Sequence, residues 1–209
     1  VSRIDVELEM LTCGPIEADP EAEAAFLDYL QSSGGPLRLD NCQVNGQIMA
    51  RGLAGQSRAT SLRLYFDIFR AFDTASGELF RALANNRSLL ELNLQDNDIS
   101  NENWTILCRS LQVHPSLLKM NLQNTNRRAR NRLTVSLLDE SKKERTRAIA
   151  DMLAENTVLQ SIQLSDIEID ETIYRESILP RLETNVYRLR VDAVNVKAIE
   201  DMPFRQKVL

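Results

Sequence analysis

Short pairs of alternating apolar residues recur along the chain at nearly constant spacing. Each pair has the form apolar-x-apolar, and the pairs are Val6/Leu8, Leu37/Leu39, Leu62/Leu64, Leu92/Leu94, Met120/Leu122, Ile162/Leu164 and, more weakly, Val191/Ala193. The steps between successive pairs are 31, 25, 30, 28, 42 and 29 residues, so all but one lie near 28. Such alternation predicts a short strand that buries one of its faces.

A stretch with helical periodicity follows most of these pairs and predicts a helix with one apolar face. The apolar stripes are Ile48/Met49/Leu53, Leu79/Phe80/Leu83/Ala84, Trp104/Leu107/Cys108/Leu111, Ile149/Met152/Leu153 and Ile178/Leu179/Leu182. Three helices are expected to end in similar segments, at 84–87, 154–157 and 183–186, each of which contains asparagine. Asparagine tolerates the left-handed conformation that often terminates a helix.

A strand–helix unit of about 28 residues cannot bury its own apolar face, but stacked units can. Stacking strand on strand gives a parallel sheet, and because helices are wider than strands the stack should curve. The sequence therefore predicts an α/β solenoid of about six or seven units, with a curved parallel sheet on the concave side and helices on the convex side. We expect this solenoid over residues 1–192, with an inserted loop near 124–143, and a cap or the start of a further segment at 193–209.

One motif is specific enough to suggest a family. Residues 89–99 read L-x-x-L-x-L-x-x-N-x-I, and residues 37–44 repeat its last eight positions with Cys42 at the position of Asn97. On these motifs the chain resembles leucine-rich repeat proteins of the long-repeat, ribonuclease-inhibitor-like kind and is similar to the repeat domain of tropomodulin. Other units depart from the motif, with Asp67, Thr125 and Ile167 at the position of Asn97. The resemblance implies a binding scaffold with no catalytic chemistry of its own.

The composition agrees with a core built mainly from leucine and argues against two classes of partner, nucleic acids and membranes. Thirty of the 209 residues are leucine, against 11 aromatic residues, and the net charge is −5. Nucleic-acid-binding domains are usually basic, so we expect no nucleic-acid partner. No stretch of 18 consecutive apolar residues is present, so we expect no membrane span either.

Two further features concern the location of the chain and its extent. Three widely spaced cysteines are an odd number and fit a reducing, cytoplasmic compartment better than a disulfide framework. The chain begins with Val1 rather than methionine, directly in patterned sequence. We therefore expect it to be a piece of a longer protein.

Candidate catalytic chemistry is sparse. His114 is the one histidine in the sequence, so any catalytic triad would have to use it, and its place before Pro115 is typical of a turn. The cysteines lack the CxxC spacing of a zinc site, and the glycines form neither GxGxxG nor a P-loop. We expect no metal, no cofactor and no enzymatic activity.

Binding residues are predicted from strand alternation, because the neighbours of the buried residues must point out of the sheet. The expected first row is Glu7, Arg38, Arg63, Asn93, Asn121, Gln163 and Asp192, the second is Glu9, Asp40, Tyr65, Gln95, Gln123 and Ser165, and the third is Glu91, Lys119 and Ser161. Interface hot spots favour tyrosine and arginine, which singles out Arg38, Arg63 and Tyr65. The leading hypothesis is a non-enzymatic scaffold that binds a protein partner on the concave face of its sheet.

The second hypothesis about function rests on the long step of 42 residues between the apolar pairs that begin at Met120 and Ile162. The extra residues contain a basic cluster formed by Arg127, Arg128, Arg130 and Arg132, and the alternating Leu133, Val135 and Leu137 that follow could form a small strand or flap. Insertions in solenoids are loops that often bind partners, although a solvated loop is the simpler interpretation. The alternative function is tropomodulin-like binding of a cytoskeletal filament end through this basic loop.

Overall fold

The structure is a computed structural model that describes residues 20–32, 34–40, 46–54, 57–65, 73–125, 135–164 and 169–195. Its elements, in chain order, are α1 (Pro20–Ser32), β1 (Pro36–Asp40), α2 (Gly46–Leu53), β2 (Ser61–Tyr65), α3 (Asp73–Leu83), β3 (Glu91–Asn93), α4 (Asn101–Leu111), β4 (Lys119–Asn121), α6 (Val135–Glu155), β5 (Ser161–Gln163), α7 (Glu171–Ile173), the π-helical turn η2 (Tyr174–Ile178) and α8 (Leu179–Asn195). This alternation of strands and helices confirms the predicted α/β class.

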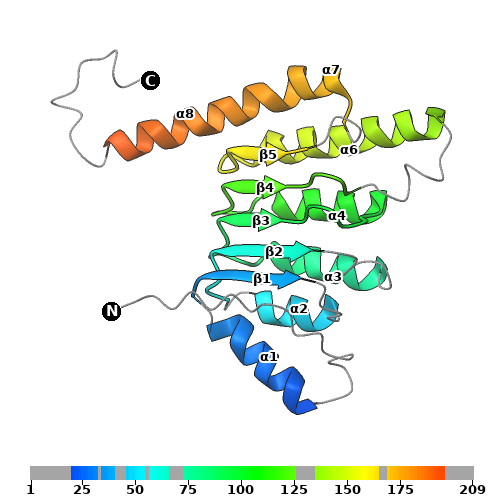
Figure 1. Cartoon of the computed structure of the whole chain (residues 1–209). Coiled ribbons are helices and arrows are strands. Elements are labelled where there is room, and N and C mark those ends of the chain that lie inside the picture. Colours follow the sequence, from blue (N-terminus) through cyan, green and yellow to red (C-terminus); the bar gives the residue numbers. More distant parts are fainter. Residues whose placement is uncertain are drawn as a thin grey trace.

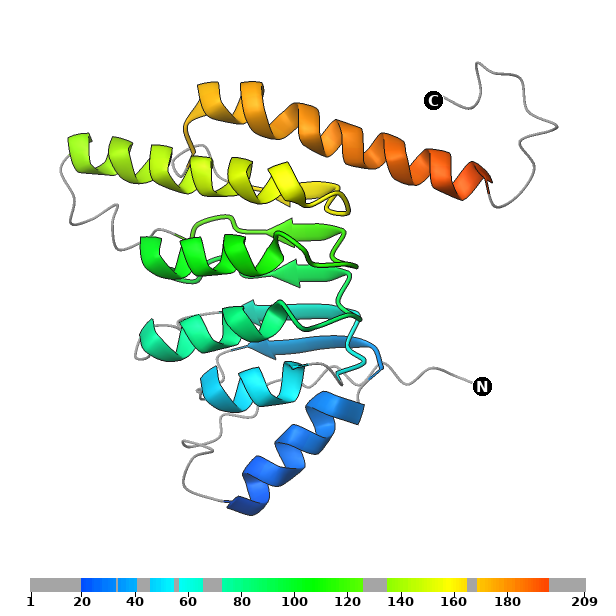
Figure 2. The same ribbon diagram turned by 180° about the vertical axis from the view of Figure 1, so that it is seen from behind.

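The strands form one parallel sheet in the order β1-β2-β3-β4-β5, which is also their order in the sequence. Equivalent apolar residues lie in register, so that Leu62 pairs with Leu37 on one side and with Leu92 on the other. The helices α2, α3, α4 and α6 stack on one side of the sheet and leave its other face open (Figure 1), and Figure 2 shows this helical layer from behind. The second to sixth predicted pairs are thus the five strands.

The core lies between the sheet and the helices. The predicted helix stripes supply most of it, and Phe80, Trp104 and Leu107 have no solvent-exposed surface. Leu179 is an exception, because 39% of its surface is exposed where the stripe prediction buried it. Within the described residues, none of the helices combines the length and the apolar character that crossing a lipid bilayer requires.

Polar side chains join neighbouring units at the edge where the helices end and the strands begin. The Nδ2 atom of Asn86 donates to the carbonyl oxygen of Leu53 at 2.9 Å, and that of Asn156 donates to the carbonyl oxygen of Leu111 at 2.6 Å. The predicted helix ends at 84–87 and 154–157 are confirmed, since α3 stops at Leu83 and α6 at Glu155. The sequence pattern did not reveal that these asparagines also bond the preceding unit.

The seventh predicted pair is wrong, because Val191 and Ala193 belong to helix α8. Residues 171–195 are helical throughout, with a wider π turn that ends two residues before Pro180, whose ring cannot fit beside an ordinary helical carbonyl. The predicted helix end at 183–186 is wrong for the same reason. The first predicted pair, Val6/Leu8, lies outside the described residues.

This C-terminal helix covers the last unit of the stack. Ile178 and Leu182 are 0% and 6% exposed and belong to the core. Asn185 donates from Nδ2 to the carbonyl oxygens of Asn156 and Leu159, at 3.1 and 2.8 Å. Asn185, inside helix α8, therefore makes the kind of hydrogen bond between units that Asn86 and Asn156 make from positions after a helix. Helix α8 also continues past residue 192, the predicted boundary of the solenoid.

The insertion also differs from its prediction. From Val135 onward the chain is already helix α6, which has 21 residues and spans about 31 Å. The interpretation of Leu133, Val135 and Leu137 as a strand or flap is wrong for the described part, because Leu137 is helical and 56% exposed. The first half of this helix was missed because its buried positions are polar, namely Ser141 and Arg145, four residues apart. The basic cluster Arg127, Arg128, Arg130 and Arg132 lies outside the described residues.

Candidate functional site

The open face of the sheet, opposite the helices, carries rows of polar side chains, and we call it the concave face. Strand alternation places every second residue there, since the residues between them are buried. Its middle row is continuous across all five strands and consists of Arg38, Arg63, Asn93, Asn121 and Gln163, each in register with the next. The structure therefore aligns these five residues as the sequence predicted.

The predicted third row lies toward the beginning of the strands. Ser61, Glu91, Lys119 and Ser161 are in register there. The Nζ atom of Lys119 lies 2.7 Å from Oε1 of Glu91, and both side chains are about half exposed or more. An ion pair this exposed contributes less than about 1 kcal/mol to stability, so its main effect is to hold two charges in fixed positions. The sequence had placed Glu91, Lys119 and Ser161 in this row without naming them as binding residues, and the structure adds Ser61.

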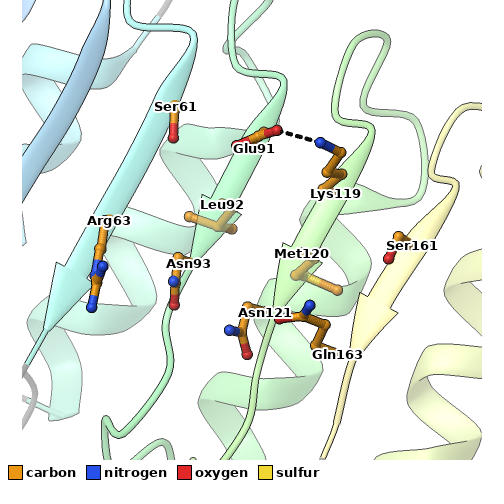
Figure 3. A pocket seen from close by; sticks show the side chains of 10 residues that line it. All are labelled: Ser61, Arg63, Glu91, Leu92, Asn93, Lys119, Met120, Asn121, Ser161 and Gln163. Carbon is orange, nitrogen blue, oxygen red and sulfur yellow. Dashed lines mark hydrogen bonds and ion pairs between the residues drawn. The ribbon is translucent and has the colours of Figure 1, made fainter.

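The two polar rows surround a shallow hollow of about 340 Å³ (Figure 3). Its lining is Ser61, Arg63, Glu91, Leu92, Asn93, Lys119, Met120, Asn121, Ser161 and Gln163. Sites for small organic ligands are mostly apolar with a few polar groups. This hollow has the opposite character, because eight of its ten lining residues are polar or charged.

Hydrogen bonds to the chain fix the orientation of two amides beside the hollow. The Oδ1 atom of Asn93 accepts the backbone N–H of Gln95, and Oδ1 of Asn121 accepts that of Gln123, both at 3.0 Å. Nδ2 of Asn121 also donates to Oε1 of Gln95 at 3.1 Å, which joins β4 to the turn after β3. Each amide group is therefore presented in one defined orientation.

The remaining predicted binding residues have mixed outcomes. Tyr65 pairs with Asp40 at the end of β2, but its side chain is not among the described ones. Asp192 belongs to α8 and is not in the sheet, so its assignment to the first row is wrong. Glu7, Glu9 and Ser165 lie outside the described residues.

His114 is buried in the loop between α4 and β4, where it bonds the backbone of its own loop, and is not part of the concave face. It is 1% exposed, and its Nδ1 atom accepts the backbone N–H of Leu117 at 3.1 Å. Burial, with a smaller contribution from the Arg87 cation, lowers the pKa of His114 to about 4. The imidazole is therefore neutral at physiological pH.

The described residues contain no group of three or more His, Cys, Asp or Glu side chains that could hold a metal ion. Cys108 packs in the core, where burial raises the pKa of its thiol to about 12. A thiol in this state is protonated and a poor nucleophile. The chemistry that the described side chains offer on the concave face is recognition through charges and amides.

Comparisons with known proteins show the fold. No family model matches the chain, and no curated protein matches it in sequence. One of the similar solved structures is leiomodin-1 actin-binding site 2, with a TM-score of 0.62 and 17% identity over 81% of this chain and 92% of that one. Another is the Caenorhabditis elegans tropomodulin C-terminal domain, with a TM-score of 0.59 and 17% identity over 85% of this chain and 99% of that one. The chain thus has the leucine-rich repeat fold of tropomodulin-type domains.

Proposed function

We propose that this chain is a non-enzymatic leucine-rich repeat domain that binds a protein partner through its concave face. The observation that carries the proposal is the continuous row from Arg38 to Gln163, held in register by five paired strands beside a polar hollow. The backbone of paired strands is already ordered, so no loop has to be ordered when a partner binds, which favours affinity. Arginine is also among the residues that most often dominate binding energy at protein interfaces.

The position of His114, the one histidine of the sequence, does not support a catalytic role. The imidazole of His114 is enclosed between α4 and β4, with its Nδ1 atom engaged by the backbone. A general base must reach a substrate proton within hydrogen-bonding distance. A histidine that is 1% exposed in a loop between repeats has no access to a bound partner on the sheet.

Actin is the first partner to test. One structure of the same fold is described as an actin-binding site, and this chain covers 92% of it. At 17% identity most surface residues differ between the two chains, so the likeness in fold suggests the partner and leaves the contact residues to be found. Filament-end binding through Arg127, Arg128, Arg130 and Arg132 is the finer alternative.

Two assays with the purified chain test this function. In co-sedimentation with actin filaments, the chain should enter the pellet in a saturable manner if it binds along filaments or at exposed subunits. In seeded elongation, it should slow filament growth at low stoichiometry if it binds an end. A chain that neither pellets nor changes elongation at concentrations up to about 50 μM, where contacts weaker than about 6 kcal/mol would be missed, contradicts actin as the partner.

A further inference from the structure

The described side chains of the concave face include more cations than anions, although the whole chain is acidic. The sequence carries a net charge of −5. Among the side chains that the structure describes on this face, Arg38, Arg63 and Lys119 are cationic, and Glu91 is the one anion. Lys119 and Glu91 pair with each other at 2.7 Å, and Arg38 and Arg63 are two further cations, each of which already has a contact within the chain. A positive surface on an acidic chain favours an anionic partner.

The two arginines are neighbours. Arg38 on β1 is in register with Arg63 on β2, and adjacent strands lie about 4.8 Å apart. Like charges directly opposite each other in a sheet repel, so an anion placed between them gains from both. Each guanidinium carries five N–H donors in a planar arrangement that matches a carboxylate, so an arginine that already has a contact within the chain can bind a second acceptor.

The rest of the middle row is chemically different, because it consists of amides. Within the described part of the chain, the side chain of Gln163 and the Nδ2 group of Asn93 make no hydrogen bond to another residue. Side-chain amides both donate and accept, which is what the N–H and C=O groups of a peptide main chain require. The row crosses four gaps between strands and is therefore about 19 Å long, with cations at one end and amides at the other.

We propose that the concave face binds an acidic, extended segment of the partner protein. Carboxylates of that segment bind Arg38 and Arg63, and its main chain forms hydrogen bonds with Asn93, Asn121 and Gln163. The proposal rests on the concave face being the binding surface, and it adds the chemistry of what binds there. A nucleic-acid strand would also be anionic, but it has no peptide groups to match the amides.

Synthetic peptides test this chemistry directly. Three fluorescein-labelled twelve-residue peptides of Ser and Gly are compared, carrying four Asp or Glu residues, the matching Asn and Gln residues, or four Lys residues. Fluorescence anisotropy at about 0.1 M salt should show the acidic peptide binding at least about tenfold more tightly than the amide peptide, with the lysine peptide weakest. Addition of the acidic peptide should also shift the side-chain NH₂ signals of Asn93, Asn121 and Gln163 in ¹H–¹⁵N spectra.

A matched pair of variants separates the concave face from overall charge. Arg38→Gln/Arg63→Gln should weaken the acidic peptide about tenfold or more, since two charge-assisted contacts are lost. Arg109→Gln/Arg147→Gln removes the same charge from exposed positions on α4 and α6 and should leave affinity within about twofold, because distant surface charges are screened by salt. Circular dichroism on both variants checks that the fold is retained.

Each opposite result overturns the proposal. Equal binding of the acidic and amide peptides, equal loss in the two variants, or absence of binding by all three peptides at millimolar concentration contradicts it. Tighter, Arg38- and Arg63-dependent binding of an oligothymidylate of twelve nucleotides would assign the face to nucleic acid instead. If the acidic peptide does not bind but actin binding still depends on the concave face, the proposed function stands and only the peptide chemistry is rejected. If the acidic peptide binds but actin does not, only actin is rejected as the partner.

Discussion

His114 occupies, in the loop between α4 and β4, the position that Asn86 holds one unit earlier. The Nδ1 atom of His114 accepts the N–H of Leu117 at 3.1 Å, and Oδ1 of Asn86 accepts the N–H of Leu89 at 2.9 Å. The two residues differ on their other side, where Asn86 donates from Nδ2 to the preceding helix end. The Nε2 atom of His114 is buried and has no hydrogen-bond partner among the described residues.

His114→Asn should therefore stabilise the fold. An amide retains the acceptor and places a donor where it can reach the preceding unit, and satisfying a buried donor contributes about 1 kcal/mol. The melting temperature should rise by about 2–4 °C for a chain of this size. The reverse change, Asn86→His, should destabilise by about 1–3 kcal/mol. Urea denaturation of both variants measures this, and a destabilised His114→Asn would contradict the equivalence of the two sites.

Stability should also depend on pH through the same residue. The pKa of His114 is about 4 in the fold, below its ordinary value of 6.5, so between these values the unfolded chain binds a proton that the folded chain does not. This contribution is complete above pH 6.5 and decreases as the pH falls toward 4. The free energy of unfolding should therefore be about 2 kcal/mol lower at pH 5 than at pH 7.5 through this residue.

The His114→Asn variant is the control for this pH dependence. Carboxylates titrate mainly below pH 5 and affect both proteins alike. The difference in unfolding free energy between wild type and variant should therefore widen from pH 7.5 to pH 5. A difference that stays constant over this range would contradict a neutral, buried imidazole.

The sheet was predictable because its signal is local and repeated. Leu62, Leu92 and Met120 recur in short alternating pairs, and the stacking of similar strand–helix units brings them into register. The middle row of the concave face followed from that register. Its ion pair between Glu91 and Lys119 did not, since a contact between side chains depends on their rotamers.

The helices were harder to predict where polar residues are buried. In the N-terminal half of α6 the buried positions are Ser141 and Arg145, which an apolar pattern does not detect. In α8, Val191 and Ala193 imitate a strand pair because two residues cannot distinguish a period of 2 from one of 3.6. Asn185 was read as a helix end although it lies within α8, where it bonds the preceding unit.

Arg145 should be essential for the junction between α4 and α6. It is 2% exposed, its Nε atom donates to Oδ1 of Asn101 at 2.7 Å, and its guanidinium lies 4.6 Å from the centre of the Trp104 ring. Lysine has neither the planar group nor the number of donors, so Arg145→Lys should destabilise by at least about 2 kcal/mol. Arg147→Lys, at an exposed position of the same helix, should change stability by less than about 0.5 kcal/mol. Equal unfolding midpoints for the two variants would contradict this role.

Gly52 should be required for helix α1 to pack on α2. A Cβ atom added at Gly52 would lie 2.3 Å from Cδ1 and 2.9 Å from Cβ of Leu30, so Gly52→Ala forces the helices apart. We expect a loss of about 1–3 kcal/mol, against a gain in helix propensity of up to about 1 kcal/mol. At Gly77 the nearest atoms are 3.1–3.4 Å away, so Gly77→Ala should be close to neutral.

A double-mutant cycle identifies the cause of the Gly52 effect. Leu30→Ala alone should destabilise by about 2–5 kcal/mol because it empties a buried position. Combined with Gly52→Ala, the total loss should be smaller than the sum of the two single losses, since the clash is removed. Additive losses would show that Gly52 matters for a reason other than its contact with Leu30.

Actin-filament binding by charge-reversed variants tests the role of the concave face most directly. Wild type, Arg38→Glu/Arg63→Glu and Arg109→Glu/Arg147→Glu are titrated against filaments in parallel, with melting temperatures measured for each. We predict that the first double variant loses binding by more than about tenfold while its melting temperature stays within about 3 °C, and that the second binds like wild type. Wild-type affinity in Arg38→Glu/Arg63→Glu would show that the partner contacts another surface and would contradict the account.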